Sequence, residues 1–576
     1  MEILNDLCYP SRVVHYSLFR RYIIIKKKAQ KLPTDIQPFR WTALLLLAFA
    51  TLLTYIFSDI LSPVKSLLET SRDWDSGVFG TYAGSAPFLN IFFFIMIFSG
   101  VILDKMGVRF TAILSGLIMI VGAVINWYAL TEFFPGTNLE HWLNNNLNYI
   151  PVFDELGVSP FYLGMPASAK LASAGFMIFG CGVEMSGITI ARGVVKWFRG
   201  KELALAMGLN MAIGRLGVAT CMIFSPLIAK AYIMGSADVS NSIAFGIIML
   251  MLALVVFIVY SFWDKKMDTQ GSDAQGKDDP FRIRDIGKIL TNSGFWLIAL
   301  LCVLYYSAII PFQKYAVNML ECNLHFSVVL ADSFWASGAA MTVQYFAMIA
   351  TAACALSSNF CKKKLKISLV ACSVILLVAV CFMSYKQQSA GAIFSVFPLL
   401  AMCITPILGY YVDRKGKAAT MLMLGSILLI ACHLVFAFLL PLSKGNGAGG
   451  FVIAYASILV LGASFSLIPA SLWPSIPKLV GNNSLGTAYA LIFWIQNVGL
   501  WLVPILIGKV LTVSNTDVTE KLRLGLITSD EASVMYDYTN PLIMLACFGV
   551  AAFILGFILK ITDRKKKLGL ELPNTK

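Results

Sequence analysis

Long apolar segments recur along the whole of this chain of 576 residues, and they constrain its fold more than any other feature. Each segment holds about twenty residues, which is the length that a helix needs to cross the hydrocarbon core of a bilayer. Hydrophobic residues make up 58% of the sequence and charged residues only 13%. No soluble domain of useful size can be separated from these segments, so the sequence predicts an all-α, polytopic protein embedded in a lipid bilayer.

The charges, cysteines and histidines argue against several other classes of protein. The net charge of +14 lies mostly in short clusters between the apolar segments, whereas a nucleic-acid-binding protein shows a basic stripe on a polar fold. We therefore expect no nucleic-acid partner. The 12 cysteines form no CxxC pair and the 4 histidines form no cluster, so we expect no metal site, no cofactor and no enzyme activity.

The basic segments predict the topology. Residues 1–40 and the tail 563–576 are basic, whereas the loop 131–167 contains no lysine or arginine. The positive-inside rule places both termini in the cytoplasm and this loop outside. The polar segment 264–292 has the composition of a cytoplasmic linker, and it divides the chain into two halves.

Fourteen transmembrane helices are predicted. The N-terminal half (41–263) contains six of them and the C-terminal half (293–562) contains eight. Two of the eight, within about 333–385, are separated by the basic turn CKKKLK, which belongs inside, so this extra pair leaves the orientation of the other helices unchanged. The predicted helices are about 41–62, 78–103, 110–130, 168–192, 203–229, 238–262, 294–318, 333–357, 366–385, 390–412, 418–441, 451–476, 485–511 and 540–561.

A short motif occurs once in each half. GVILDKMGVR at 100–109 and GYYVDRKGKA at 409–418 share the pattern G-x-x-x-D-[KR]-x-G, and each follows an apolar segment. The candidate gating residues of this motif are Gly100, Asp104, Lys105, Gly107 and Arg109 in the first copy, and Gly409, Asp413, Arg414 and Gly416 in the second.

A second pair of segments supports an internal duplication. The fifth apolar segment and the one that begins at Leu485 align, with Arg215 opposite Asn497 and Gly217 opposite Gly499. Internal repeats in a membrane protein indicate a transporter whose site lies between the halves.

Two opposite charges lie inside neighbouring helices of the first half. Glu184 precedes the basic turn at Arg192 by eight residues, and Arg215 follows the start of the next helix at Leu203 by twelve. With a rise of 1.5 Å per residue, the two lie roughly 12 and 18 Å from the turn, at similar depth in antiparallel helices. Ionisable residues are costly in a bilayer, so this pair is a candidate functional site.

The repeated turn resembles the signature of the major facilitator superfamily. Within this superfamily, residues 197–217 and 471–499 resemble the lysosomal dipeptide uniporters, as do GVE at 182–184 and SDILSP around Asp59. The resemblance implies two pseudo-symmetric six-helix halves that move dipeptides by alternating access, as a uniporter functional as a monomer. Since that family has twelve helices, the extra pair within 333–385 is expected to be a peripheral addition.

The resemblance also implies a set of substrate-binding residues around a central cavity. A dipeptide zwitterion needs a carboxylate for its ammonium and a cation for its carboxylate, which Glu184 and Arg215 would supply. The aspartates of the repeated turns would latch the cytoplasmic ends of the halves together in one state. The residues expected near the cavity are Tyr55, Asp59, Glu184, Arg215, Tyr305, Tyr306, Trp473, Gln496 and Asn497.

Each of these residues also has a purely structural interpretation. Glu184 and Arg215 would then form an ion pair that locks two helices together. Asp59, one turn after Tyr55 on the same helix face, would be solvated at the membrane interface, and the aromatic residues would be packing groups. Lys314 is expected to snorkel outward. The aspartates of the two turns would be ordinary loop charges.

The cargo, the coupling and the location also stay open at this point. The alternative cargo is a small organic anion bound by Arg215, with protons coupled through Glu184. Proton coupling through Glu184 or Asp59 is compatible with a dipeptide carrier as well. Residues 1–40 and the tail contain no convincing dileucine sorting signal, which favours a bacterial inner membrane over a lysosomal membrane.

Overall fold

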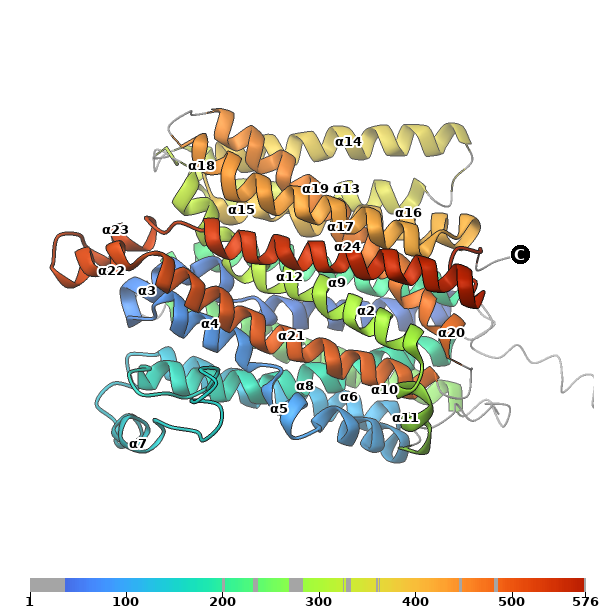
Figure 1. Cartoon of the computed structure of the whole chain (residues 1–576), viewed down its shortest axis with the longest axis horizontal. Helices are drawn as coiled ribbons and strands as arrows, with labels where there is room; N and C mark the ends of the chain where they lie inside the picture. The colour runs from blue at the N-terminus through green and yellow to red at the C-terminus, as the bar shows by residue number, and fades with distance from the viewer. Residues whose placement is uncertain are drawn as a thin grey trace, which may run out of the picture.

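The computed structural model of the chain is a bundle of long helices that run roughly side by side (Figure 1). It confirms the predicted all-α membrane fold. Residues 1–36, most of the predicted linker (269–282) and the last residues of the tail lie outside the described part. The structure describes residues 37–198, 202–231, 237–268, 283–324, 326–327, 333–358, 361, 363–444, 448–480 and 485–573.

The N-terminal half is built from the following elements. They are α2 (Gln37–Ser58), η2 (Ser62–Val64), α3 (Lys65–Arg72), α4 (Ser76–Ser85), α5 (Phe88–Phe92), α6 (Ile95–Leu130), α7 (Asn138–Asn146), α8 (Ala167–Phe198), α9 (Leu203–Lys230) and α10 (Val239–Asp268). The short helix α11 (Ile283–Leu290) precedes the C-terminal half, so both described edges of the predicted linker are helical.

The C-terminal half contains α12 (Ser293–Asn323), η3 (Phe334–Ala336), α13 (Gly338–Ser357), α14 (Lys363–Lys386), α15 (Ala390–Phe394), α16 (Val396–Lys415), α17 (Ala418–Leu434), the π-helical turn η5 (Val435–Leu439) and α18 (Leu440–Leu442). It continues with α19 (Ala448–Leu472), η6 (Trp473–Ser475), α20 (Ile476–Leu479), α21 (Leu485–Ser514), α22 (Thr516–Arg523), α23 (Ser529–Ser533) and α24 (Thr539–Lys566).

In the described part of the chain, 13 helices are long and apolar enough to cross a membrane. The difference from the predicted fourteen lies at residues 78–103, where the chain forms α4, α5 and the first part of α6 instead of one continuous helix. Pro87, at the start of α5, lacks the N–H that a continuing helix requires, and Phe94 takes a left-handed conformation with φ of 52°. The broken segment is compatible with a fourteenth crossing, so the total of fourteen crossings remains a prediction.

The two copies of the repeated motif form equivalent turns. Gly107 has φ of 78° inside α6, where two helices meet, and Gly416 has φ of 71° at the end of α16. Side chains other than glycine rarely adopt such angles. The second glycine of the motif therefore has the same conformational role in both halves.

The glycines aligned in the second pair of repeats also pack alike. A Cβ atom on Gly217 would lie 2.1 Å from the Leu52 carbonyl oxygen of α2, and one on Gly499 would lie 2.0 Å from Ser307 Oγ of α12. Because α2 and α12 are the first long helices of their halves, the duplicated segments approach equivalent partners. This packing agrees with two pseudo-symmetric halves.

The bundle has two distinct ends. We call the end that carries residues 131–166 and 515–538 the long-loop end, and the end that carries the two motif turns the turn end (Figure 1). The halves pack against each other through α4 with α21 and through α9 with α16. The extra helices α13 and α14 pack on each other at one edge of the bundle, beside α9 and α16, which confirms that they are peripheral (Figure 1).

Candidate substrate-binding site

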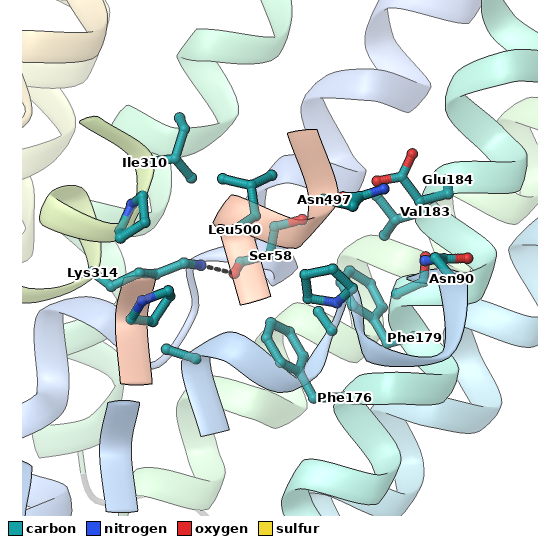
Figure 2. A pocket seen from close by; sticks show the side chains of 16 residues that line it. Ser58, Asn90, Phe176, Phe179, Val183, Glu184, Ile310, Lys314, Asn497 and Leu500 are labelled. Atoms are coloured by element: carbon teal, nitrogen blue, oxygen red, sulfur yellow. Dashed lines mark hydrogen bonds between the residues drawn. The ribbon is translucent and has the colours of Figure 1, made fainter. Parts of the chain in front are cut away.

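A cavity lies between the two halves, in the middle of the bundle (Figure 2). Its volume is about 150 Å³. Helices α2, α4, α5 and α8 supply its wall from the N-terminal half, and α12 and α21 supply the opposite wall. The lining residues are Ser58, Ala83, Ala86, Pro87, Asn90, Phe176, Phe179, Gly180, Val183, Glu184, Ile310, Pro311, Lys314, Asn497, Leu500 and Pro504.

Glu184 and Asn497 face each other across this cavity. The Asn497 amide nitrogen points at the Glu184 carboxylate (Figure 2). Among the described residues, no basic group forms an ion pair with Glu184. The wall nearby is formed by Phe179, Val183 and one further polar side chain, that of Asn90. The cavity thus presents a carboxylate that is available to a cationic ligand group.

Arg215 lies outside this cavity and does not pair with Glu184. Its guanidinium carbon is 4.4 Å from the centroid of the Phe465 ring and 5.9 Å from that of the Tyr55 ring. Phe465 belongs to the C-terminal half, so the contact crosses between the halves. The structural interpretation of the two charges as an ion pair is therefore not supported by this conformation.

Asp59 and Lys314 form a buried ion pair between the halves. Lys314 Nζ lies 2.6 Å from Asp59 Oδ1, and the two side chains are only 12% and 7% exposed. Gln313 Nε2 donates to Asp59 Oδ2 at 2.8 Å, and Lys314 also donates to the Ser58 carbonyl (Figure 2). The prediction that Lys314 snorkels outward is wrong, because the α12 face that carries Lys314 meets the other half of the protein.

The placement of Asp59 also differs from its predicted position. Helix α2 ends at Ser58, so Asp59 begins the turn that follows and does not share a helical face with Tyr55. Its carboxylate is buried, and the interpretation as a group solvated at the interface does not hold.

The predicted aromatic and amide residues separate into two groups. Trp473 Nε1 donates to the Tyr306 hydroxyl at 3.2 Å, and Gln496 Oε1 accepts from Cys302 Sγ at 3.4 Å. Tyr305 instead points into the C-terminal half, where its hydroxyl contacts the Leu422 carbonyl and Ser426. The structure therefore does not bring Tyr305 together with the other predicted site residues.

Several cavity residues were missed from the sequence. Asn90 donates to the Gly180 carbonyl at 3.2 Å, while its own side-chain oxygen has no partner among the described residues. Lys314 could have been predicted as a cavity residue, because a charged side chain inside an apolar helix indicates a functional position. Phe176 and Phe179 carried no signal that separates them from other aromatic residues of the bundle.

Three residues of the motif turns, Asp104, Arg109 and Arg414, have contacts inside their own halves. Asp104 lies 3.5 Å from Arg192 of α8, and Arg109 lies 3.9 Å from Asp264 of α10. In the second copy, the Arg414 guanidinium carbon is 4.6 Å from the centroid of Tyr410. The remaining motif residues Lys105, Gly100 and Gly409 lie at the same turns, and no atom lies within 4 Å of a Cβ built on either of these two glycines.

The halves are held together at the long-loop end. The Tyr536 hydroxyl donates to Glu69, and Lys65 Nζ lies 5.0 Å from the centroid of the same ring. Burial and the neighbouring Glu69 raise the pKa of Tyr536, so its hydroxyl remains a donor. Ser66 contacts Glu321 in the same region.

Close backbone packing seals the same end. A Cβ atom on Gly80 of α4 would lie 2.5 Å from the Pro504 carbonyl oxygen, and one on Gly84 would lie 2.4 Å from that of Trp501. Hydrogen bonds and an ion pair between described residues of the two halves lie at the long-loop end and in the middle of the bundle. The structure therefore shows a state whose long-loop end is closed.

Comparisons with known proteins agree with this architecture. Residues 155–388 match the family model of the Major Facilitator Superfamily. A crystal structure of a bacterial homologue of the human lysosomal transporter Spinster, in an inward-facing and occupied conformation, has a TM-score of 0.53 and 13% sequence identity. That comparison covers 92% of this chain and 98% of the other, and it shows a shared fold.

Curated relatives are more similar in sequence. The lysosomal dipeptide transporter MFSD1 of Gallus gallus is 25% identical over 62% of this chain and 67% of its own length. MFSD1 of Bos taurus is 25% identical over 59% of each chain, so the match spans about three fifths of that relative. With its two pseudo-symmetric halves and repeated motif turns, this chain has the fold of major facilitator superfamily proteins, and in sequence it resembles MFSD1.

Proposed function

We propose that this protein is a carrier that moves dipeptides across a membrane by alternating access, as a uniporter. The observation that carries the proposal is the cavity between the halves, in which the Glu184 carboxylate faces the opposite half without a basic ion-pair partner among the described residues. A buried carboxylate of this kind suits a ligand that brings its own cation, such as the ammonium of a peptide.

In this proposal the two ends of the dipeptide bind different side chains. Glu184, with Asn497 beside it, binds the ammonium, and Arg215 binds the carboxylate. Among the described residues, Arg215 contacts the rings of Phe465 and Tyr55 and forms no ion pair with a carboxylate, which suits it to this role. A guanidinium stacked on a ring keeps its in-plane donors available for bidentate binding. Trp473 and Gln496 lie outside the lining of the cavity in this state and would reach the substrate only in another state.

The closed long-loop end gives the proposal a direction. If the turn end faces the cytoplasm, as the basic clusters predict, the structure corresponds to a state closed to the outside. We propose that the two motif turns, with Asp104 and Asp413, join the halves at the turn end in the opposite state. Asp104 now contacts Arg192 of its own half, so that contact would be exchanged during the transition.

A proton-coupled carrier of small organic anions is the second candidate. It is favoured by the same carboxylate, because Glu184 lies in an apolar wall and is suited to carry a proton as well as to bind an ammonium. In that case Arg215 alone would bind the anion.

The location and assembly are proposals too. We propose a bacterial inner membrane, on the absence of a convincing dileucine signal in the sequence, and a carrier that works as a monomer. Protease protection of tags at each terminus, in intact cells and in inverted vesicles, tests whether both termini lie in the cytoplasm.

Ligand binding to the purified protein separates the two cargo classes. We expect a dipeptide such as leucyl-alanine to raise the midpoint of thermal unfolding, since a ligand that binds only the native state stabilises it. Lactate and oxalate should have no effect at the same concentration. Stabilisation by lactate or oxalate, with no effect of dipeptides, would replace the dipeptide carrier by the anion carrier.

A further inference from the structure

The Asp59–Lys314 pair lies at a place where the substrate cavity and the contact between the halves coincide. Lys314 lines the cavity together with Glu184, but from the opposite half of the protein (Figure 2). Its ammonium lies 2.6 Å from Asp59, which belongs to the half that carries Glu184. Lys314 therefore lines the space for a ligand and also forms one of the bonds that join the halves.

Lys314 has few alternative partners in its surroundings. Its ammonium lies 5.8 Å from the centroid of the Phe176 ring, and it donates to Asp59 and to the Ser58 carbonyl. If Asp59 moved away, the ammonium would remain in an apolar cavity without a counter-ion, which is costly. A carboxylate brought by a ligand is the group that best replaces Asp59.

Asp59, in contrast, keeps polar contacts when Lys314 leaves. Gln313 Nε2 donates to its Oδ2 at 2.8 Å, and the Ser62 hydroxyl lies 3.4 Å from its Oδ1. The released carboxylate thus keeps the Ser62 hydroxyl of its own half, and it keeps the Gln313 amide of α12 until the halves separate. Exchange of one carboxylate for another at Lys314 therefore costs less free energy than breaking the ion pair with no replacement.

We propose that Lys314 is a second substrate-binding residue. In the state shown here it binds the carboxylate of the dipeptide in exchange for Asp59, whereas Arg215, which lies outside this cavity, binds that carboxylate in the opposite state. The inference rests on the proposed dipeptide transport and deepens it. A substrate whose ammonium reaches Glu184 extends toward Lys314 along the cavity. When its carboxylate takes the lysine, the ion pair between Asp59 and Lys314 is lost, so one of the contacts that join the halves beside the closed long-loop end is removed. Occupancy of the cavity thereby promotes the change of state.

The exchange predicts opposite effects for the two partners of one ion pair. Lys314→Gln removes a ligand contact and should weaken the binding of leucyl-alanine by about ten- to a hundredfold, the range for one charge-assisted hydrogen bond. Asp59→Asn removes the carboxylate that competes for Lys314, so it should tighten the binding of leucyl-alanine. Leucyl-alanine amide, which lacks the carboxylate, should be affected by less than about threefold in both variants.

The experiment is a binding titration of the purified full-length variants with leucyl-alanine and with its amide. Lys314→Arg should restore most of the preference for the free carboxylate. Lys170→Gln is the matched control: Lys170 is another buried lysine, which contacts Asn148 and the Leu143 carbonyl away from the cavity, and its loss should leave the ratio of the two affinities unchanged.

If Lys314→Gln does not fold, the double variant Asp59→Asn/Lys314→Gln decides, because no unpaired charge remains in it. It should fold and should have lost the preference for leucyl-alanine over the amide. A double variant that keeps the full preference overturns the inference.

A lysine that serves only as a latch gives a different result. Both single variants would then break the same bond, and they would shift the affinities for leucyl-alanine and its amide in the same direction and by similar factors, which overturns the role in binding. If the wild-type protein binds neither compound, the proposed dipeptide transport fails and the inference fails with it. If it binds leucyl-alanine and no variant alters the ratio, the inference alone fails.

Discussion

Neutralising Glu184 is the sharpest perturbation of the proposed site. Glu184→Gln keeps the shape of the side chain beside Asn497, but it removes the charge offered to a ligand ammonium. One charge-assisted hydrogen bond contributes about 1.5–3 kcal/mol, so the affinity for free dipeptides should fall by roughly ten- to a hundredfold. N-acetylated dipeptides lack the ammonium, and their affinity should change by less than about threefold.

The structure also predicts the effect of this variant on stability. Removing one partner of a buried ion pair costs about 3–5 kcal/mol, because an unpaired charge is left behind. Glu184 has no ion pair with a described residue, so Glu184→Gln should lower the free energy of unfolding by less than about 1 kcal/mol. Thermal unfolding and ligand titration of the same preparation measure both quantities. Glu520→Gln, on the exposed helix α22, is the control.

Two results would refute this account of Glu184. Equal losses of affinity for free and N-acetylated dipeptides would show that the carboxylate does not recognise the ammonium. A large loss of stability, restored by the double variant Glu184→Gln/Arg215→Ala, would show that the two charges form a structural pair in the dominant state of the protein.

Four other predictions follow from the same geometry. Arg215→Ala should weaken free dipeptides by about ten- to a hundredfold and spare C-amidated ones, measured by titration; equal losses would exclude a carboxylate contact. Asp104→Asn should lower the rate of transport more than the affinity for the substrate. An unchanged turnover at normal expression would show that Asp104 is an ordinary loop charge with no role in gating. Gly217→Ala should destabilise by about 1–3 kcal/mol because its Cβ meets a carbonyl oxygen of α2, whereas Gly208→Ala, with no neighbour within 4 Å, should not; similar unfolding midpoints would contradict the close packing. In a background without native cysteines, a cysteine at Asn144 should react with an impermeant thiol reagent from outside and one beside Lys363 should not; labelling beside Lys363 would remove the extra pair from the crossings.

Repetition made the architecture predictable from the sequence. The pattern around Asp104 and Asp413 predicted equivalent turns, and Gly107 and Gly416 have matching positive φ angles. Such angles depend on local backbone sterics, which a motif encodes directly. The break of the second crossing was not predicted, although Pro87 was visible, since proline within an apolar run is compatible with a kinked helix as well as with a new start.

The direction of individual side chains was harder to predict. Tyr305 and Tyr306 are adjacent on α12, and about 100° of rotation separates them, so one packs inside its half while the other meets Trp473. Lys314 was expected to point outward because hydrocarbon is costly for a lysine. The sequence of α12 alone does not reveal that Asp59, 255 positions earlier, provides a buried counter-ion.

Uptake into proteoliposomes tests the central proposal most directly. Purified protein should accumulate labelled leucyl-alanine when the vesicles are loaded with unlabelled dipeptide, should do so at equal pH on both sides, and should lose this exchange in Glu184→Gln. Labelled lactate or oxalate should not enter faster than in vesicles without protein. Exchange of lactate or oxalate driven by a pH gradient, with no exchange of dipeptide, would contradict the account.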